Sequence, residues 1–447
     1  MTVYLQLHYT DLLGVLRSIT QVTRSIPHNP GVESIEVFID GSSVYGLGEI
    51  ENSDLKLKPI SETLTKSPWD QKVYLALSRI YYPDGKRHPF DPRFIAERTN
   101  EYMESIGYKP VMGVEVEFFL FNDVRVHIDP IKQYLEIDSS ETAHGFRLGL
   151  PAKKAYHVPE PLDTLGWIRR EIIEALEIQG YISNKTHHEV ASNGQVEISS
   201  GVYPPTRLGD YIQILKKTAK TIANKHGLKA VFLPKPIPGD NGSGMHVHVS
   251  LWDNGRNLFY DPNNKFGLSQ LARYFIGGLI EHGQSLSAIV SPTTNSYKRL
   301  IPGYEAPIYL TWGPRNRSVA IRVPAINNPA HVRIEYRPPD PTANPYLALS
   351  AIILAGLDGV KKKIEPPPPV RENVYKWSKD KLREYSIKQL PRNLSEALDY
   401  LETDNEYLKP IFSKQLIEKY IELKRKEIIQ VEYNPTPMEY YYYATLW

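Results

Sequence analysis

The sequence predicts an α+β protein rather than a parallel series of βαβ units. Residues 1 to about 90 contain short strands separated by turn clusters such as Asp40-Gly41-Ser42-Ser43 and Tyr82-Pro83-Asp84-Gly85. After this segment, strand and helix patterns follow one another in irregular order. A chain of 447 residues has room for two or three domains, and we place one boundary near residue 92, which separates residues 1–91 from 92–447.

The predicted helices all lie in the second segment. Asp163 and Thr164 are polar residues suited to start the first helix, while Gly180 and Gly227 are suited to close the first and second. We expect helices over Glu160–Gly180, Leu208–His226, Leu268–His282, Asn344–Lys363, Ser395–Leu401 and Lys414–Ile429.

Composition excludes several classes of function. The 53 Lys and Arg residues nearly balance the 51 Asp and Glu residues, so the charge gives no case for nucleic-acid binding. There is no cysteine, so any metal must bind to oxygen and imidazole, which favours Mg²⁺ or Mn²⁺. We find no signal-peptide pattern and no apolar run long enough to span a bilayer, and we therefore expect a cytoplasmic protein that does not bind membranes.

The segment Gly113–Phe121, GVEVEFFLF, carries the first candidate site residues. On a strand, alternate side chains point to opposite faces, so Glu115 and Glu117 share one face and the apolar residues share the other. Two neighbouring carboxylates repel each other unless a cation lies between them. For one such pair alone, an ordinary solvent-exposed face remains the more common explanation.

Three further strands show the same division into an apolar and a polar face. In His188–Ile198, the turn Ser192-Asn193-Gly194 is suited to a hairpin that would bring Glu189 and Glu197 together. The other two strands are Gly244–Leu251, with His246, His248 and Ser250 on its polar face, and Val332–Arg337, with Arg333, Glu335 and Arg337 on its polar face.

Four such strands together favour an enclosed sheet or barrel lined by acids, imidazoles and arginines. A carboxylate-rich site with imidazole suits a two-metal centre for phosphoryl chemistry. Arg299, Arg317, Arg322 and Arg337 offer planar donor groups for carboxylate and phosphate. The sequence contains neither a GxxxxGK[ST] loop nor a well-placed GxGxxG, so ATP, if used, is held by other means.

Ordered motifs along nearly the whole chain resemble the glutamine synthetase family, type I. The motifs are Asp11-Leu12-Leu13-Gly14, Phe38-Ile39-Asp40-Gly41-Ser42-Ser43, Glu115-Val116-Glu117-Phe118-Phe119, His188-Glu189-Val190-Ala191, Gly194-Gln195-Val196-Glu197, Asn241-Gly242-Ser243-Gly244-Met245-His246-Val247-His248, Asn295-Ser296-Tyr297-Lys298-Arg299-Leu300, Tyr304-Glu305-Ala306-Pro307, Asn316-Arg317-Ser318 and Arg333-Ile334-Glu335-Tyr336-Arg337-Pro338.

This resemblance implies a site built around two divalent cations, Mg²⁺ or Mn²⁺, and ATP. One cation would be bound by Glu117, Glu189 and Glu197, and the other by Glu115, His246 and Glu335. The ATP site would be lined by His248 and Ser250, with Arg317 and Arg322 binding phosphate.

The resemblance also implies where the other substrates bind. Glutamate would be bound by Asn241, Gly242, Arg299 and Arg337. Glu305 would be the carboxylate of a flap that closes the site. Asp40 would deprotonate ammonium, with Ser43 beside it and Tyr156 near the ammonium pocket.

The family's architecture implies a β-grasp domain over residues 1–91 and a catalytic domain of curved antiparallel strands and helices over residues 92–447. Subunits would form a homo-oligomer of two stacked hexameric rings, with Asp40 supplied to each site by a neighbouring subunit. The aromatic C-terminal segment Glu439–Trp447 would cross to the opposite ring.

The expected reaction is ATP-dependent formation of glutamine from glutamate and ammonia through a γ-glutamyl phosphate. An alternative is a related ligase that joins glutamate, or a similar acid, to a polyamine or another amine. More distant alternatives are an inactive scaffold of the same fold, which should lack metal ligands, and a guanidino kinase, most of which should use a cysteine.

Overall fold

The computed structural model describes every residue except 1, 27–30, 143–147, 326–327 and 440–447. The aromatic tail that was predicted to cross to a partner ring therefore lies outside the described residues, apart from Glu439. None of the described helices is both long and apolar enough to cross a membrane.

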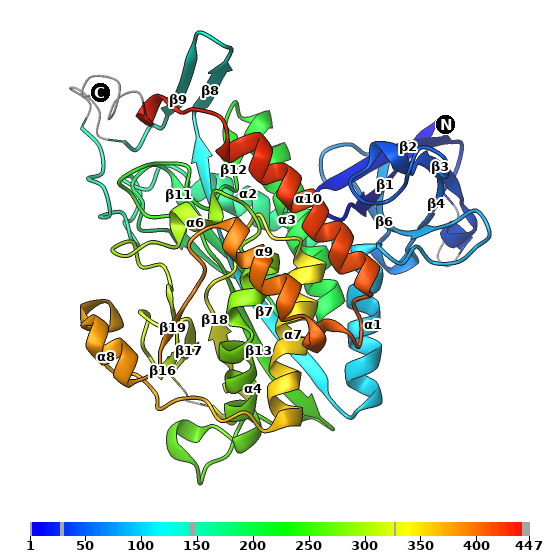
Figure 1. Ribbon diagram of the computed structural model, residues 1–447. Coiled ribbons are helices and arrows are strands. Elements are labelled where there is room, and N and C mark those ends of the chain that lie inside the picture. Colours follow the sequence, from blue (N-terminus) through cyan, green and yellow to red (C-terminus); the bar gives the residue numbers. More distant parts are fainter. Residues whose placement is uncertain (1, 27–30, 143–147, 326–327, 440–447) are drawn as a thin grey trace.

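The N-terminal segment folds into a mixed sheet with strand order β2-β1-β6-β4-β3, and β5 pairs with the start of β6. β1 and β6 run parallel, and the other pairs are antiparallel. Leu5, Leu7, Leu55, Leu57 and Ile80 form the core of this segment, which lies to one side of the molecule in Figure 1. The strands are β1 (Val3–Thr10), β2 (Leu16–Thr23), β3 (Val37–Asp40), β4 (Asp54–Pro59), β5 (Thr65–Lys66) and β6 (Val73–Tyr81).

A nine-stranded sheet forms the centre of the second segment. The strands follow one another in the order β10-β11-β7-β13-β18-β17-β16. Two short strands pair at its sides, β12 with β7 and β14 with β13. Only the pair β16–β17 is parallel. The strands are β7 (Lys109–Phe121), β10 (Ser183–His188), β11 (Gln195–Ser200), β12 (Lys229–Val231), β13 (Met245–Asp253), β14 (Arg256–Asn257), β16 (Trp312–Pro314), β17 (Ile321–Val323) and β18 (Ile334–Tyr336).

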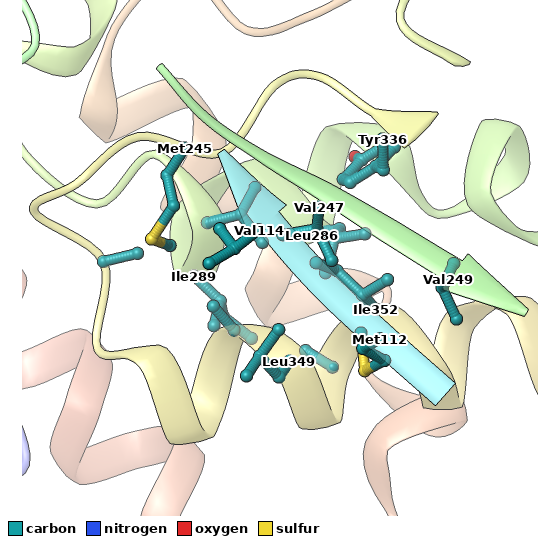
Figure 2. Close-up of a cluster of buried hydrophobic side chains, with 14 of the residues drawn as sticks. Met112, Val114, Met245, Val247, Val249, Leu286, Ile289, Tyr336, Leu349 and Ile352 are labelled. Atoms are coloured by element: carbon teal, nitrogen blue, oxygen red, sulfur yellow. The ribbon is translucent and has the colours of Figure 1, made fainter. Parts of the chain in front are cut away.

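Helices cover the apolar face of this sheet, as the alternation in the sequence predicted. Figure 2 shows Val114 of β7 and Val247 of β13 above Leu349 and Ile352 of α7 (Pro345–Lys362). All four side chains are buried in the same hydrophobic cluster. Because this face is buried against helices, the opposite face of β7 and β13 is left to carry the polar residues.

The sequence predicted six of the ten α-helices that the described residues form, and its largest error in a helix end is at the start of α2. α1, which the sequence did not predict, begins at Pro92 behind the N-cap Asp91, at the predicted domain boundary. The predicted start of α2 at Glu160 was wrong, because the carboxylate of Asp163 accepts hydrogen bonds from the backbone of Leu165 and from Arg169. The helices are α1 (Pro92–Ser105), α2 (Gly166–Ile178), α3 (Pro205–Lys225), α4 (Gln270–Glu281), α5 (Gly283–Val290), α6 (Ser296–Arg299), α8 (Lys379–Glu384), α9 (Leu394–Thr403) and α10 (Lys414–Glu432).

Two smaller pairs of strands complete the architecture. A hairpin of β8 (Asp123–Ile128) and β9 (Gln133–Asp138) projects from the end of β7 (Figure 1). β15 (Tyr309–Leu310) pairs with β19 (Lys388–Gln389). The mixture of sheets and helices confirms the predicted α+β class.

Candidate active site

Strand register brings the predicted acids and imidazoles into one row across the sheet. Glu197 lies opposite Glu117, and Glu115 lies opposite His246. On the next strand pair, His248 lies opposite Glu335. These side chains come from strands far apart in the sequence, so the polar faces predicted one strand at a time form a single surface.

A tight turn brings Glu189 into this row from the end of β10. Gly194 adopts a positive φ of 79° within the turn. A Cβ atom there would lie 2.4 Å from the carbonyl oxygen of Leu120, so only glycine fits. The turn thereby places Glu189 beside Glu197, as the hairpin pattern in the sequence predicted.

Two groups of three side chains have the geometry of a metal site. The first is Glu115, His246 and Glu335, and the second is His187, Glu189 and Glu197; within each, the potential ligand atoms lie within 4.8 Å of one another. The first group is the set that the sequence predicted for one cation. The second contains His187 in place of Glu117.

Glu117 lies between the two groups rather than in one of them. Its Oε1 is 3.9 Å from Nε2 of His246, and its Oε2 accepts a hydrogen bond from the backbone of Gly244 at 2.7 Å. A carboxylate in this position can turn toward either group. We propose, as the sequence did, that Glu117 binds a cation together with Glu189 and Glu197.

The electrostatics of the site show an excess of negative charge. Burial raises the pKa of Glu189, and the nearby Glu117 and Glu197 raise this pKa further, to well above its usual range. Burial also raises the pKa of Glu117, an effect that His246 only partly offsets. Buried carboxylates that repel one another, with imidazole alongside and no thiolate in the chain, fit a hard divalent cation at each group.

Metal binding to this site should depend on pH. Because the pKa of Glu189 is raised, this carboxyl holds its proton to higher pH than usual, and a cation must displace that proton. We expect the Mn²⁺ affinity of the protein to rise with pH until Glu189 has lost its proton, with protons released on binding. Calorimetric titrations in two buffers of different ionisation enthalpy would measure the release, and equal heats in both buffers would contradict the expectation.

A polar cavity opens in front of the row of acids. Besides the acids and His246, it is lined by predicted substrate residues and by residues that the sequence analysis did not single out. The predicted residues are Tyr156, Asn241, Gly242, Arg299, Glu305, Arg317 and Arg337, and the others include Lys185, His187, Gln195 and Tyr304.

The arginines of the site differ in how many of their donors are free. Nη1 of Arg299 donates to the carbonyl oxygen of Pro338 at 2.8 Å, and Nη2 donates to that of Arg337 at 3.1 Å. Arg299, which was predicted to bind substrate, lines the cavity, and these two hydrogen bonds also hold the segment that carries Arg337 and Glu335 in place. Arg337 itself donates to Oε1 of Glu335 at 2.7 Å and reaches the cavity.

A second cavity adjoins the first and contains the two residues predicted to line the ATP site. His248 and Ser250 lie in it, together with apolar residues of β7 and β13, and it shares Glu115 and Lys185 with the first cavity. Nε2 of His248 is 3.2 Å from Oε1 of Glu115. The second cavity therefore opens onto the first metal group through Glu115.

Four predicted residues lie outside both cavities: the fully buried Glu335, and Arg322, Asp40 and Ser43. Arg322 forms an ion pair with Glu335. Asp40 lies at the end of β3 in the N-terminal segment, exposed to solvent, where its carboxylate accepts hydrogen bonds from the backbone of Ser42 and the hydroxyl of Ser43. Within one subunit, Asp40 and Ser43 are therefore not part of the site.

Two of the missed residues could have been found from the alternation on β10. Lys185, His187 and Glu189 are two residues apart, so all three point to the polar face. Nζ of Lys185 is 3.4 Å from Oε1 of Glu197, and Nε2 of His187 is 3.3 Å from the same atom. Both side chains therefore contact the acids of the site.

The fold and the site together fit a class of metal-dependent enzymes, with two groups of carboxylate and imidazole side chains that could each hold a cation beside a second cavity. Family models for the "Glutamine synthetase, beta-Grasp domain" and the "Glutamine synthetase, catalytic domain" match residues 1–83 and 89–443. The chain therefore belongs to the glutamine synthetase family, an ATP-dependent ligase family that uses divalent metals. The α+β fold with an N-terminal β-grasp domain is thereby confirmed.

Individual relatives extend this similarity along almost the whole chain. The chain is 46% identical to a glutamine synthetase of Sulfolobus acidocaldarius over 98% of its own length and 95% of the relative, and 40% identical to one of Thermotoga maritima over 95% and 92%. It is also 39% identical to a 3-hydroxylaminophenol mutase of Cupriavidus pinatubonensis over 99% and 96%. The solved glutamine synthetase of Plasmodium falciparum superposes with a TM-score of 0.88 at 29% identity, covering 98% of this chain and 95% of that one.

Proposed function

We propose that this enzyme forms glutamine from glutamate and ammonium, with ATP as the source of energy, through a γ-glutamyl phosphate. The observation that supports this most strongly is the single cavity in which Glu115 and His246 of the first candidate metal group, and all of the second group, lie together with Glu305, Arg317 and Arg337. The names of the relatives at 40% and 46% identity agree with this reaction.

The residues of the cavity suit the first step, phosphoryl transfer to the γ-carboxylate of glutamate. Two bound cations would neutralise charge on the phosphates and polarise the transferred group. Arg317 is exposed at the cavity and can approach the transferred phosphate, while Arg337 can bind the carboxylate of glutamate. The phosphorylated γ-carboxyl reacts readily with water, so the flap around Glu305 must also exclude solvent.

The second step requires a neutral amine. A carboxylate attracts ammonium and accepts one of its protons, a role that suits Glu305 and, from a neighbouring copy of the chain, the exposed Asp40. We therefore also propose that the enzyme works as a ring-shaped homo-oligomer, since Asp40 and Ser43 lie away from the site of their own subunit.

The wall near Tyr156 favours a small amine. Its ring stacks on that of His157 with centroids 3.9 Å apart, and the ring of His187 meets His157 edge-on at 4.4 Å. We propose that these packed rings, of which the His187 ring belongs to the second metal group, form a wall that favours ammonium over a polyamine.

A substrate panel tests the proposal. Purified enzyme with Mg²⁺, ATP and glutamate is offered ammonium, hydroxylamine or a set of polyamines, and ADP and amide are measured. We expect ADP and glutamine in equal amounts with ammonium, and the hydroxamate with hydroxylamine. ADP formation only with polyamines would show that the substrate is a larger amine and not ammonium. No ADP with any amine would contradict the proposed ligase reaction.

Substitution of Glu305 should separate metal binding from amide formation. Glu305 is exposed at the cavity and adopts a left-handed φ of 59°, a conformation that is costly for a residue with a side chain and is found mainly at functional sites. We expect Glu305→Ala to lower the rate of glutamine formation by roughly 10²–10⁴-fold, the usual contribution of an acid–base group. Mn²⁺ affinity should stay unchanged, and turnover equal to that of the exposed control Glu174→Ala would refute the role.

A further inference from the structure

Two lysines from separate segments converge on Tyr304, the residue before Glu305. Nζ of Lys153 lies 3.8 Å from the centroid of the Tyr304 ring, and Nζ of Lys235 lies 3.7 Å from it. Both distances are well within the range of an attractive cation–π contact. We call Lys153, Lys235 and Tyr304 the clasp.

The clasp holds the backbone of the flap, residues 301–306, as well as the ring of Tyr304. Nζ of Lys153 also donates a hydrogen bond to the carbonyl oxygen of Gly303 at 3.2 Å. On the other side of Glu305, the hydroxyl of Tyr375 donates to the carbonyl oxygen of Ala306 at 2.6 Å. Glu305 is thus fixed between two anchored neighbours, although its own side chain is exposed.

Both lysines of the clasp are anchored to the buried Asp240, Lys235 through its ammonium group and Lys153 through its backbone. Nζ of Lys235 donates to the backbone carbonyl of Asp240, and the backbone N–H of Lys153 donates to Oδ1 of Asp240 at 3.0 Å. Two ammonium groups that share one ring repel each other, so these anchors are needed to keep both in place.

Asp240 connects the clasp to the metal site. Its Oδ2 accepts hydrogen bonds from the backbone of Ser192 at 2.9 Å and from the side chain of Asn193 at 2.8 Å. Ser192 and Asn193 form the turn between Glu189 and Glu197. The carboxylates of the metal site and the position of the flap are therefore set by one connected group of residues.

We propose that Lys153 and Lys235 are positioning residues that act through Tyr304 to hold Glu305 over the cavity and so keep water from the reacting carbonyl. This inference rests on the proposed function, since it assigns a task to the flap in that reaction. None of the three clasp residues needs to contact substrate for this role.

A loosened clasp has a definite chemical consequence. Water would attack the γ-carbonyl carbon of the γ-glutamyl phosphate, the bond between that carbon and the phosphate oxygen would break, and phosphate would leave. Glutamate is regenerated, and the net reaction is hydrolysis of ATP to ADP and phosphate without amide.

The test compares the double variant Lys153→Met/Lys235→Met and the variant Tyr304→Leu with the conservative variant Tyr304→Phe. Lys154→Met, at an exposed neighbouring lysine, is the matched control. Each assembled enzyme is assayed for kcat and KM of glutamate, for Mn²⁺ affinity, and for phosphate released per glutamine formed.

We expect Tyr304→Leu and the double variant to lower kcat for glutamine about 10-fold, in keeping with the loss of two cation–π contacts. KM for glutamate and Mn²⁺ affinity should change less than about 2-fold, and phosphate released per glutamine should rise above one. Tyr304→Phe keeps the ring face and should restore most of the rate, with the ratio close to one. The proposal would be overturned if Tyr304→Leu had the same kcat as the parent and released the same amount of phosphate per glutamine.

Amide hydrogen exchange of the flap, residues 301–306, separates a failure of this inference from a failure of the proposed function. The clasp predicts faster exchange there in Tyr304→Leu and in the double variant than in the parent or Lys154→Met, whatever reaction the enzyme catalyses. Unchanged exchange would overturn the clasp even if glutamine is formed. Faster exchange in a protein that forms no glutamine would uphold the clasp as the device that holds the flap and reject only the ligase assignment.

Discussion

Glu189→Gln should abolish most of the amide-forming activity while leaving the metal-free protein at least as stable as the parent. A bound cation contributes several kcal/mol to the transition state, so weakening its site should lower the rate by about 10²–10⁴-fold, at about 1.4 kcal/mol per factor of ten. The stability should not fall, because the substitution removes a buried charge that Glu117 and Glu197 repel.

The raised pKa of Glu189 also predicts how the stability of the metal-free protein changes with pH. The folded-state pKa of Glu189 lies above the unfolded value, so the folded protein binds more protons than the unfolded chain between the two values. The free energy of unfolding of the metal-free parent should therefore decrease as pH rises through this range, and Glu189→Gln should remove that decrease.

Thermal unfolding with a chelator and with Mn²⁺ measures both effects. The parent should gain stability from Mn²⁺, while Glu189→Gln should gain little. Glu174→Gln, at an exposed position on α2, is the control and should behave as the parent. A Glu189→Gln protein that is much less stable without metal, or that keeps its stabilisation by Mn²⁺, would contradict the assignment of this residue to a metal.

Asp210→Asn should cause the largest loss of stability among single changes outside the site. Asp210 is buried on α3 and accepts two hydrogen bonds from Arg93 of α1, at 2.9 and 3.0 Å, and one from the hydroxyl of Tyr346 of α7 at 2.7 Å. Removing one partner of a buried ion pair leaves the other charge uncompensated, which costs about 3–5 kcal/mol. Glu97 also pairs with Arg93, so we expect the lower end of this range.

Denaturant unfolding checks this expectation at neutral pH. The matched control is Glu171→Gln, which breaks a partly exposed pair with Lys225 at 3.0 Å and should cost less than about 1 kcal/mol. Equal losses in the two variants would show that the three helices do not depend on the buried pair.

Strand alternation made much of the site predictable. Once Gly113–Phe121 and Gly244–Leu251 are read as strands, the period of two decides that Glu115, Glu117, His246 and His248 face away from the apolar core. The same period extends to Lys185 and His187 on β10, which could have been predicted in this way. Helix ends were less predictable, because the polar residue expected to start α2, Asp163, is used by Arg169.

By itself, the sequence determined which side chains belong to the polar face of each strand, since that follows from local backbone geometry and from the ordered family motifs. Only the tertiary structure decided which side chains contact one another. It places His187 with Glu189 and Glu197, and it directs Arg299 to backbone carbonyls. It also brings Lys153 and Lys235 together at Tyr304. The physical reason is that each of these contacts joins different segments of the chain. Their distances depend on strand register and loop packing, which no local pattern of residues encodes.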